Sequence, residues 1–338
     1  MGVAEIRKDV LGKAVDAAID KNIARGFTTG VLVCICFDGE MVYRRAAGLA
    51  DREANCLMQE NTLFRLASIS KAFTSLAVAA LVEQRKLSLD DSVSKWLPYF
   101  TPKLSNGFVP VITIRDLLCH MSGLDYRWAQ KEDGPYAKAG VSDGLDITGL
   151  TLEENLKRLA SAPLCFAPGS SWLYSLGPDV LGAVVAKVQG TDFRTALAEL
   201  VTKPLGMTDT AFYASESDRK RVAAPYYLDN GKLARLVETI RTGESPIADK
   251  GLMSQMSANQ LGDMMARPGF GFSLGWGVLV DPVEAVPPQT AGTLAWGGVY
   301  GSKWFADPAK KLSVVTMTTT ALDEVVSVDV RNAIYGSF

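Results

Sequence analysis

Apolar positions near the start of the chain follow helix and strand periods in turn. From residue 4 to 24 apolar side chains recur every three or four positions, which predicts an amphipathic helix that stops near Gly26. Two β-rich runs follow, Thr29–Phe37 and Glu40–Ala46, and the Asp38-Gly39 dipeptide between them is a strong hairpin signal. Residues 64–85 are apolar on nearly every helical face, which is typical of a central, buried helix.

The remaining chain divides into a helical middle and a β-rich end. From about 89 to 235 helical pieces alternate with Pro- and Gly-bearing loops, and Thr113 followed by Asp116 resembles a capped helix start. The further expected elements are short helices at 179–188 and 193–201, strands at 274–280, 293–296, 302–306 and 312–318, and a final helix at 323–335. Strands at both ends predict one sheet built from the two ends of the chain, with a helical insert between them.

The composition is that of an ordinary folded protein. Hydrophobic residues make up 48% of the 338 positions and charged residues 21%, which excludes a disordered chain. Lys and Arg number 35 against 37 Asp and Glu, so we expect no nucleic-acid partner. The longest apolar runs are far shorter than the roughly 18–20 residues of a membrane span. The first nine residues hold no apolar signal core, so we expect neither a membrane span nor export.

The cysteines and the single histidine limit the cellular compartment and the kinds of metal site that we expect. The five cysteines form no C-x-x-C pair and are expected to be reduced thiols, which favours a cytoplasmic protein. The single histidine, His120, excludes a three-histidine zinc site, and no cysteine spacing indicates a metal cluster. His120 fits a helix end, where its ring can bond the last carbonyl groups, and we expect it to be structural.

Two serine patterns compete for the role of nucleophile. Gly271–Gly275 matches G-x-S-x-G, but that mechanism needs a histidine after the serine, and His120 precedes it. The flanking alternation of large and small residues favours a glycine-rich strand instead. The second pattern, S-x-x-K, occurs at Ser68–Lys71, Ser92–Lys95 and Ser217–Lys220.

Context separates the three S-x-x-K matches. Ser92 and Ser217 lie in charged stretches, where a lysine is solvated. Ser68 and Lys71 lie at the start of the apolar helix and share one helical face, close to the positive end of the helix dipole. A lysine held in an apolar wall can lose its proton and act as a base. The alternative is a capping serine with a surface lysine.

The segment Phe64–Lys71 resembles the nucleophile segment of the serine β-lactamase superfamily. Further stretches match in family order: Leu87–Pro98, Ile112–Leu124, Phe166–Gly169 leading into Tyr174-Ser175, and Pro204–Met207. Trp296–Gly301 is similar to the corresponding stretch of the family VIII carboxylesterases, which are related to class C β-lactamases. The resemblance implies an α+β, β-lactamase/transpeptidase-like fold: an antiparallel sheet flanked by helices, plus a mostly helical domain. We expect residues 1–66 and 265–338 to form the α/β sheet domain, and 67–264 the helical one.

The resemblance also implies roles for individual residues. Ser68 is the acyl-accepting nucleophile, Lys71 is a base or proton relay, and Tyr174 is a second proton-transfer group. The backbone N–H groups of Ser68 and Val299 would form the oxyanion hole. The substrate would lie against Trp296, Gly297, Gly298 and Tyr300, and the reaction needs no metal or organic cofactor.

Each of these residues also fits a structural role. Tyr174 follows Trp172 and Leu173 and could be a packing residue. Trp296-Gly297-Gly298 could be a strand end with a tight turn.

Three departures from the family pattern bear on the substrate. Trp296 stands where penicillin-handling members carry a lysine that holds the substrate carboxylate, and Leu176 stands where they carry an asparagine. Both replacements favour neutral esters, because a carboxylate buried without a partner is costly; Lys303 or Arg127 are candidate replacement cations. Near residues 229–233 the chain also lacks some tens of residues that family members carry.

We therefore expect a serine carboxylesterase that hydrolyses small short-acyl esters through a Ser68 acyl-enzyme. The alternatives are a β-lactamase or D,D-peptidase-type hydrolase, an acyltransferase of the same fold, and a non-catalytic binding homologue. The expected partner is a small-molecule ester. The sequence does not determine the natural ester, its acyl length, the enantioselectivity, the oligomeric state, or whether Lys71 or Tyr174 takes the serine proton.

Overall fold

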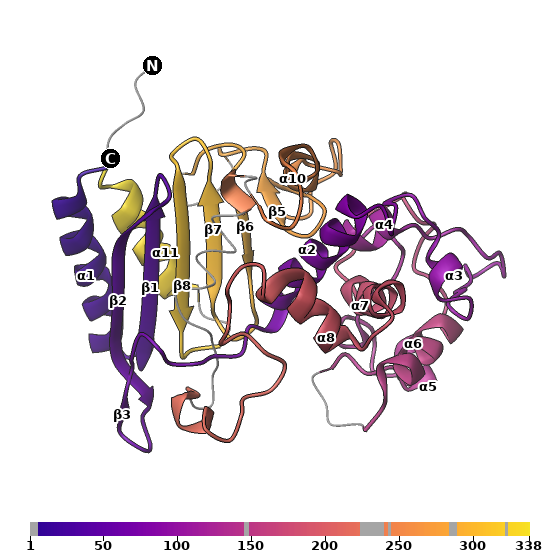
Figure 1. Ribbon diagram of the computed structural model, residues 1–338, viewed down its shortest axis with the longest axis horizontal. Coiled ribbons are helices and arrows are strands. Elements are labelled where there is room, and N and C mark those ends of the chain that lie inside the picture. Colours follow the sequence, from indigo (N-terminus) through magenta and orange to yellow (C-terminus); the bar gives the residue numbers. More distant parts are fainter. Residues whose placement is uncertain (1–5, 145–148, 224–239, 243–244, 284–288, 322–323) are drawn as a thin grey trace.

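An eight-stranded antiparallel sheet forms one part of the molecule, and helices from the middle of the chain form the other (Figure 1). The computed structural model describes residues 6–144, 149–223, 240–242, 245–283, 289–321 and 324–338. Its helices are α1 (Lys8–Ala24), α2 (Ser70–Glu83), α3 (Val93–Trp96), α4 (Ile114–Leu118), α5 (Pro135–Ala139), α6 (Leu152–Ser161), α7 (Gly177–Gln189), α8 (Phe193–Leu197), α10 (Lys250–Ser257) and α11 (Val325–Tyr335). Short 3₁₀ turns lie at η1 (Ala67–Ile69), η2 (Arg127–Ala129) and η4 (Arg219–Arg221), and a short π-helix lies at η3 (Ala198–Thr202).

The sheet joins strands from both ends of the chain. Its strands are β1 (Gly30–Phe37), β2 (Glu40–Asp51), β3 (Cys56–Leu57), β4 (Phe270–Phe272), β5 (Gly277–Leu279), β6 (Leu294–Gly297), β7 (Lys303–Asp307) and β8 (Leu312–Thr318). They lie in the order β3-β2-β1-β8-β7-β6-β5-β4. The predicted hairpin is confirmed as β1–β2. In the middle of the sheet β1 pairs with β8, from Val31 opposite Thr318 to Phe37 opposite Leu312, as expected for a sheet built from both ends.

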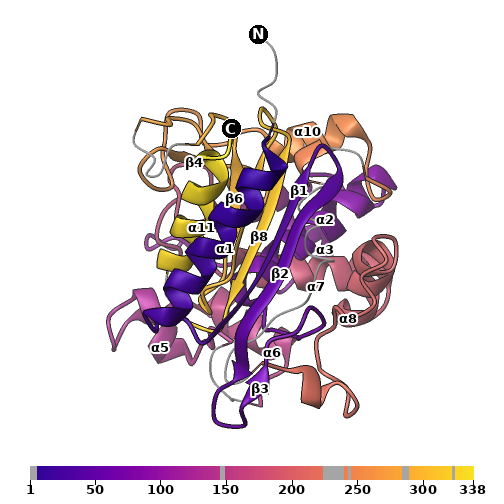
Figure 2. The ribbon, with the colours of Figure 1, turned by 90° about the vertical axis from the view of Figure 1, so that its left-hand side faces the viewer.

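Helices α1 and α11 lie side by side on one face of the sheet (Figure 2). Alternate residues of β1, among them Val31, Val33 and Ile35, pack beneath these helices. The residues between them, Leu32, Cys34 and Cys36, face the larger cluster on the opposite side. At the end of this layer the Arg7 N–H donates to the Ser337 carbonyl at 3.2 Å, so the two ends of the described chain are in contact.

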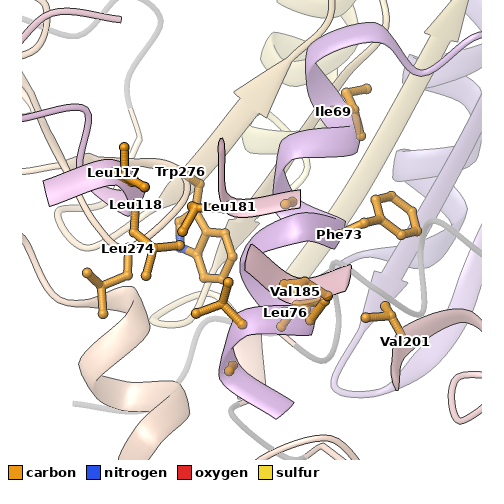
Figure 3. Close-up of a cluster of buried hydrophobic side chains, with 14 of the residues drawn as sticks. Ile69, Phe73, Leu76, Leu117, Leu118, Leu181, Val185, Val201, Leu274 and Trp276 are labelled. Carbon is orange, nitrogen blue, oxygen red and sulfur yellow. The ribbon is translucent and has the colours of Figure 1, made fainter. Parts of the chain in front are cut away.

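Helix α2 is the centre of the larger cluster, as its apolar sequence predicts. Every residue from Ala72 to Leu81 is buried. Figure 3 shows its side chains among those of the surrounding elements: Ile69, Phe73 and Leu76 from η1 and α2, Leu117 and Leu118 from α4, Leu181 and Val185 from α7, Val201 from η3, and Leu274 and Trp276 from the β4–β5 turn.

Three predicted elements need correction. The helix expected over 64–85 begins only at the η1 turn, because the backbone at Leu63 bonds across to Arg221 and Ala223. The strand expected over 274–280 is confirmed only at β5 (Gly277–Leu279), because residues 274–276 form the β4–β5 turn, which holds Gly275 at φ 141°. The helix expected over 193–201 is split between α8 and η3.

Three further expectations from the sequence concern a membrane span, the division into domains and a missing segment. Among the described residues no helix is long and apolar enough to cross a membrane. All described strands lie within 1–66 and 265–338, while the domain boundaries themselves stay a prediction. Residues 229–233, where we expect the chain to lack a segment that family members carry, lie outside the described residues.

Candidate active site

Ser68 lies in the η1 turn that leads into α2. The residue before it, Ala67, has φ 46°, in the left-handed region that side-chain-bearing residues rarely adopt. The Ser70 hydroxyl donates to the Ala67 carbonyl and holds this turn. The continuous helix therefore starts after Ser68, and the serine side chain is half-buried at its N-terminal end.

Lys71 lies one helical turn after Ser68 and contacts it directly. Its Nζ donates to Ser68 Oγ at 3.1 Å. The same nitrogen lies 5.0 Å from the ring centroid of Tyr174 and 5.7 Å from that of Tyr126. The aromatic rings and α2 thus hold the lysine in a half-buried position against the serine hydroxyl, within reach for proton transfer.

Tyr174 reaches the site from the loop before α7, and His120 packs behind it. The two ring centroids are 4.8 Å apart, and the hydroxyl oxygen of Tyr174 is buried. The Ser175 N–H donates to His120 Nδ1 at 3.1 Å, and the Leu173 N–H donates to the His120 carbonyl at 3.0 Å. His120 lies beyond the end of α4, and its ring bonds Ser175 instead of the helix carbonyls expected from the sequence.

Strand β6 closes the site on the sheet side. The Trp296 ring lies 5.5 Å from that of Tyr174. A Cβ added at Gly298, the residue after β6, would lie 2.5 Å from the Leu66 carbonyl oxygen and 3.3 Å from Ala67 Cβ, so the chain leaving β6 passes against the nucleophile turn at a distance that only glycine allows. Beyond β6, the Gly298 N–H donates to the Ser302 carbonyl at 2.9 Å and closes the turn that carries Val299.

These elements enclose one cavity of about 800 Å³. The structure brings seven of the eight predicted site residues to its wall: Ser68, Lys71, Tyr174, Trp296, Gly297, Gly298 and Val299. Tyr300 and Arg127 do not line the cavity, whereas Lys303 does.

Further cavity residues were missed by sequence reasoning. On the helical side they are Tyr126, Trp128, Asp143 and Asp179, and on the sheet side Arg267, Glu324 and Arg331. Asp179 lies in the first turn of α7, five residues after Tyr174, and this spacing could have indicated it. The others carry no local signal, because chain packing brings them to the site.

The helical side of the cavity is aromatic and acidic. The Trp128 ring stacks on Tyr126 with centroids 5.3 Å apart, and Tyr126 lies at the same distance from Tyr174. Burial raises the pKa of Tyr126 well above its ordinary range, with Tyr174 adding to the effect. Burial also raises the pKa of Asp179, while the charge of Lys71 acts in the opposite direction.

The serines of the competing G-x-S-x-G and S-x-x-K patterns have structural or surface positions, as their sequence context predicts. Ser273 of the G-x-S-x-G pattern is fully buried, and its hydroxyl donates to the Trp276 carbonyl at 2.9 Å within the β4–β5 turn. Lys95 pairs with Asp91 at 2.7 Å, and Ser217 and Lys220 are both exposed. Within the described residues no group of three or more His, Cys, Asp or Glu side chains is placed to hold a metal ion.

Comparison with known proteins identifies the family to which this chain belongs. The family model described as Beta-lactamase matches residues 15–334. The chain belongs to the beta-lactamase family. Esterase EstB of Burkholderia gladioli is 39% identical over 375 aligned positions, which cover 96% of this chain and 95% of EstB. That alignment is longer than the 338 residues of this chain, so EstB carries residues without a counterpart here.

Solved structures of this family share the fold. EstCE1, described as a hydrolase with promiscuous acyltransferase activity, is 37% identical, covers 97% of this chain and 99% of its own, and superposes with a TM-score of 0.91. A class C beta-lactamase is 20% identical, with a TM-score of 0.77 over 99% of this chain and 98% of its own. At that identity the second match shows the fold alone, and it confirms the β-lactamase/transpeptidase-like architecture.

Proposed function

We propose that this chain is a serine carboxylesterase that hydrolyses small short-acyl esters through an acyl-enzyme on Ser68. The observation that carries the proposal is the 3.1 Å contact between Lys71 Nζ and Ser68 Oγ, in a cavity with Tyr174 and strand β6. The likeness to esterase EstB over nearly the whole of both chains supports ester substrates.

The chemistry is acyl transfer in two steps. Ser68 Oγ attacks the ester carbonyl carbon while its proton passes to the Lys71–Tyr174 pair, and the alcohol leaves with a proton returned by that pair. The N–H groups of Ser68 and Val299 stabilise the negative charge that develops on the carbonyl oxygen. Water then repeats the attack on the acyl-enzyme and frees Ser68.

We also propose a cytoplasmic location, because none of the five cysteines forms a disulfide bond and reduced thiols are typical of that compartment.

Removal of the nucleophile tests the proposal. Ser68→Ala is expected to lower hydrolysis of p-nitrophenyl butyrate by on the order of 10³-fold or more, because it removes the hydroxyl on which the acyl-enzyme forms. Ser217→Ala is the matched control, since it removes an exposed serine from the same S-x-x-K pattern. Labelling by a fluorophosphonate should mark the wild type and spare Ser68→Ala. Full esterase activity in Ser68→Ala would refute the mechanism, and a wild type that neither hydrolyses nor becomes labelled would indicate a non-catalytic homologue.

Two related activities are tested with the same protein. The likeness to EstCE1 makes acyl transfer the second candidate, and faster loss of p-nitrophenyl butyrate on addition of an alcohol, with formation of the new ester, would support it. A chromogenic cephalosporin tests the β-lactamase alternative. Cephalosporin opening that outruns ester hydrolysis would replace the esterase proposal.

A further inference from the structure

The wall of the cavity beside the nucleophile is built from four aromatic rings in succession. The ring centroids of Trp128 and Tyr126 lie 5.3 Å apart, and so do those of Tyr126 and Tyr174. Trp296 follows at 5.5 Å from Tyr174, and all four side chains line the cavity. The proposed acyl transfer uses Tyr174 and places the substrate against Trp296. It gives no role to the outer two rings of the row.

The outermost ring is exposed although its neighbour is buried. Trp128 has 61% of its surface exposed, whereas Tyr126 has 6%. The two rings are stacked, with an interplanar angle of 27°, so Tyr126 covers one side of the Trp128 indole. The rest of the indole is open to solvent at the cavity. A substrate group bound against it would remove this apolar surface from water.

The backbone of Trp128 is held in place from below. Trp128 lies in the short turn η2, where the Asp143 carboxylate accepts the N–H groups of Arg127 and Trp128 at 2.8 and 2.9 Å. Hydrogen bonds to an ionised carboxylate are among the strong ones in proteins. The indole is therefore presented from a fixed turn, and a side chain fixed in this way loses little conformational entropy when it binds a ligand.

The charges around the outer rings favour a neutral ligand. Burial raises the pKa of Tyr126 well above its ordinary range, so the phenol stays neutral. The carboxyl groups of Asp143 and Asp179 on the same side of the cavity disfavour an anionic group. Lys71 Nζ lies 5.7 Å from the Tyr126 centroid, and the proton that it relays places positive charge there, which disfavours a cationic group. A neutral aromatic ring fits this surface, because rings pair at centroid distances of about 4.5–7 Å.

We propose that Trp128, with Tyr126 behind it, determines specificity by stacking on an aromatic ring in the alcohol part of the ester. The alcohol oxygen takes back a proton from the Lys71–Tyr174 pair, and the row of rings continues outward from Tyr174. The inference rests on the proposed esterase function and names its substrate class, short-acyl esters of arylalkyl alcohols. Stacking makes an aromatic ring a better ligand here than a saturated ring of similar size.

Two pairs of neutral esters separate stacking from simple apolar burial. The first pair is 2-phenylethyl acetate and 2-cyclohexylethyl acetate, which carry the ring on the alcohol side. The second pair is methyl 3-phenylpropanoate and methyl 3-cyclohexylpropanoate, which carry it on the acyl side. Acid release at constant pH gives, for each pair, the ratio of kcat/KM for the aromatic ester to that for the saturated ester. Comparison of this ratio between proteins cancels the difference in intrinsic reactivity of the two esters.

Removal of the indole should lower the ratio of the first pair. Trp128→Leu keeps an apolar side chain without a ring, and we expect the ratio to fall roughly three- to tenfold. Trp128→Phe keeps a ring and should recover most of the wild-type ratio. Phe108→Leu is the matched control, because Phe108 is exposed to nearly the same degree, 63%, and does not line the cavity. Its ratio should equal that of the wild type, and circular dichroism checks that each variant is folded.

The outcomes separate this inference from the proposed function. A fall in the first ratio in Trp128→Leu that Trp128→Phe reverses supports it. An unchanged ratio, or equal losses for both esters of the pair, would overturn it, because a purely apolar or structural side chain acts on both rings alike. A change confined to the second pair would also overturn it, since the ring would then bind on the acyl side. Each rate is also measured in Ser68→Ala, and hydrolysis that persists there would refute the esterase mechanism instead.

Discussion

The neutral state of His120 follows from its hydrogen bond. A backbone N–H can only donate, so the bond from Ser175 requires an unprotonated Nδ1. Burial lowers the pKa of His120 to about 3, and the charge of Lys71 adds to the lowering. The sequence predicted a structural histidine and missed its partner, because Ser175 lies 55 residues further along the chain. The imidazole supports the Tyr174 loop from behind.

The histidine gives the protein a specific response to acid. The pKa of His120 is about 3 in the folded state and 6.5 ordinarily, so the unfolded chain takes up a proton that the folded chain refuses. The stability it contributes is present above pH 6.5 and is lost towards pH 3, at about 1.4 kcal/mol per pH unit. Urea unfolding at pH 7, 6 and 5 should show this slope in the wild type and a flatter one in His120→Asn. Parallel pH profiles for the two proteins would contradict the assignment.

Strand β6 shows what sequence pattern can and cannot predict about an element. The strand and its glycine turn were predicted within one or two residues, because alternation and glycine are local signals. The pairing of Gly297 with Lys303, which brings a cation to the cavity, depends on the register of the β6–β7 turn. Residues 274–276 of the β4–β5 turn were predicted as part of a strand, because the alternation of large and small residues continues through the turn.

The close approach of the chain after β6 to the nucleophile turn can be tested with one methyl group. In Gly298→Ala the added Cβ would lie 2.5 Å from the Leu66 carbonyl oxygen, so either β6 or the turn must move. A shift of about 1 Å at a reacting centre can cost 10²-fold in rate, and we expect a loss of kcat of that order in ester hydrolysis.

A second glycine provides the comparison. Gly12 lies in α1 with no atom within 4 Å of an added Cβ, so Gly12→Ala should leave kcat unchanged and raise the free energy of unfolding by about 1 kcal/mol. Wild-type kcat in Gly298→Ala would show that the contact does not position the site.

At the scale of the whole molecule, the central strand pair β1–β8 joins the two ends of the chain. The sequence predicted this because strand patterns occur only near the ends. It did not predict which face of the sheet each helix covers, or that residues as distant as Ser68 and Arg331 line one cavity. Such contacts depend on how layers pack, and no periodicity along the chain contains that information.

Because Arg7 and Ser337 are in contact, the two ends of the described chain could be joined by a linker and new ends opened at another position. In a circular permutant, residue 338 would be joined to residue 6 by a short glycine–serine linker, and new ends would open between Asn106 and Gly107 in an exposed loop. We expect it to fold and to retain Ser68-dependent ester hydrolysis, as measured by circular dichroism and p-nitrophenyl butyrate turnover. A permutant opened within β1, between Val33 and Cys34, should not fold. If the first also fails, the present order of elements is itself a requirement for folding.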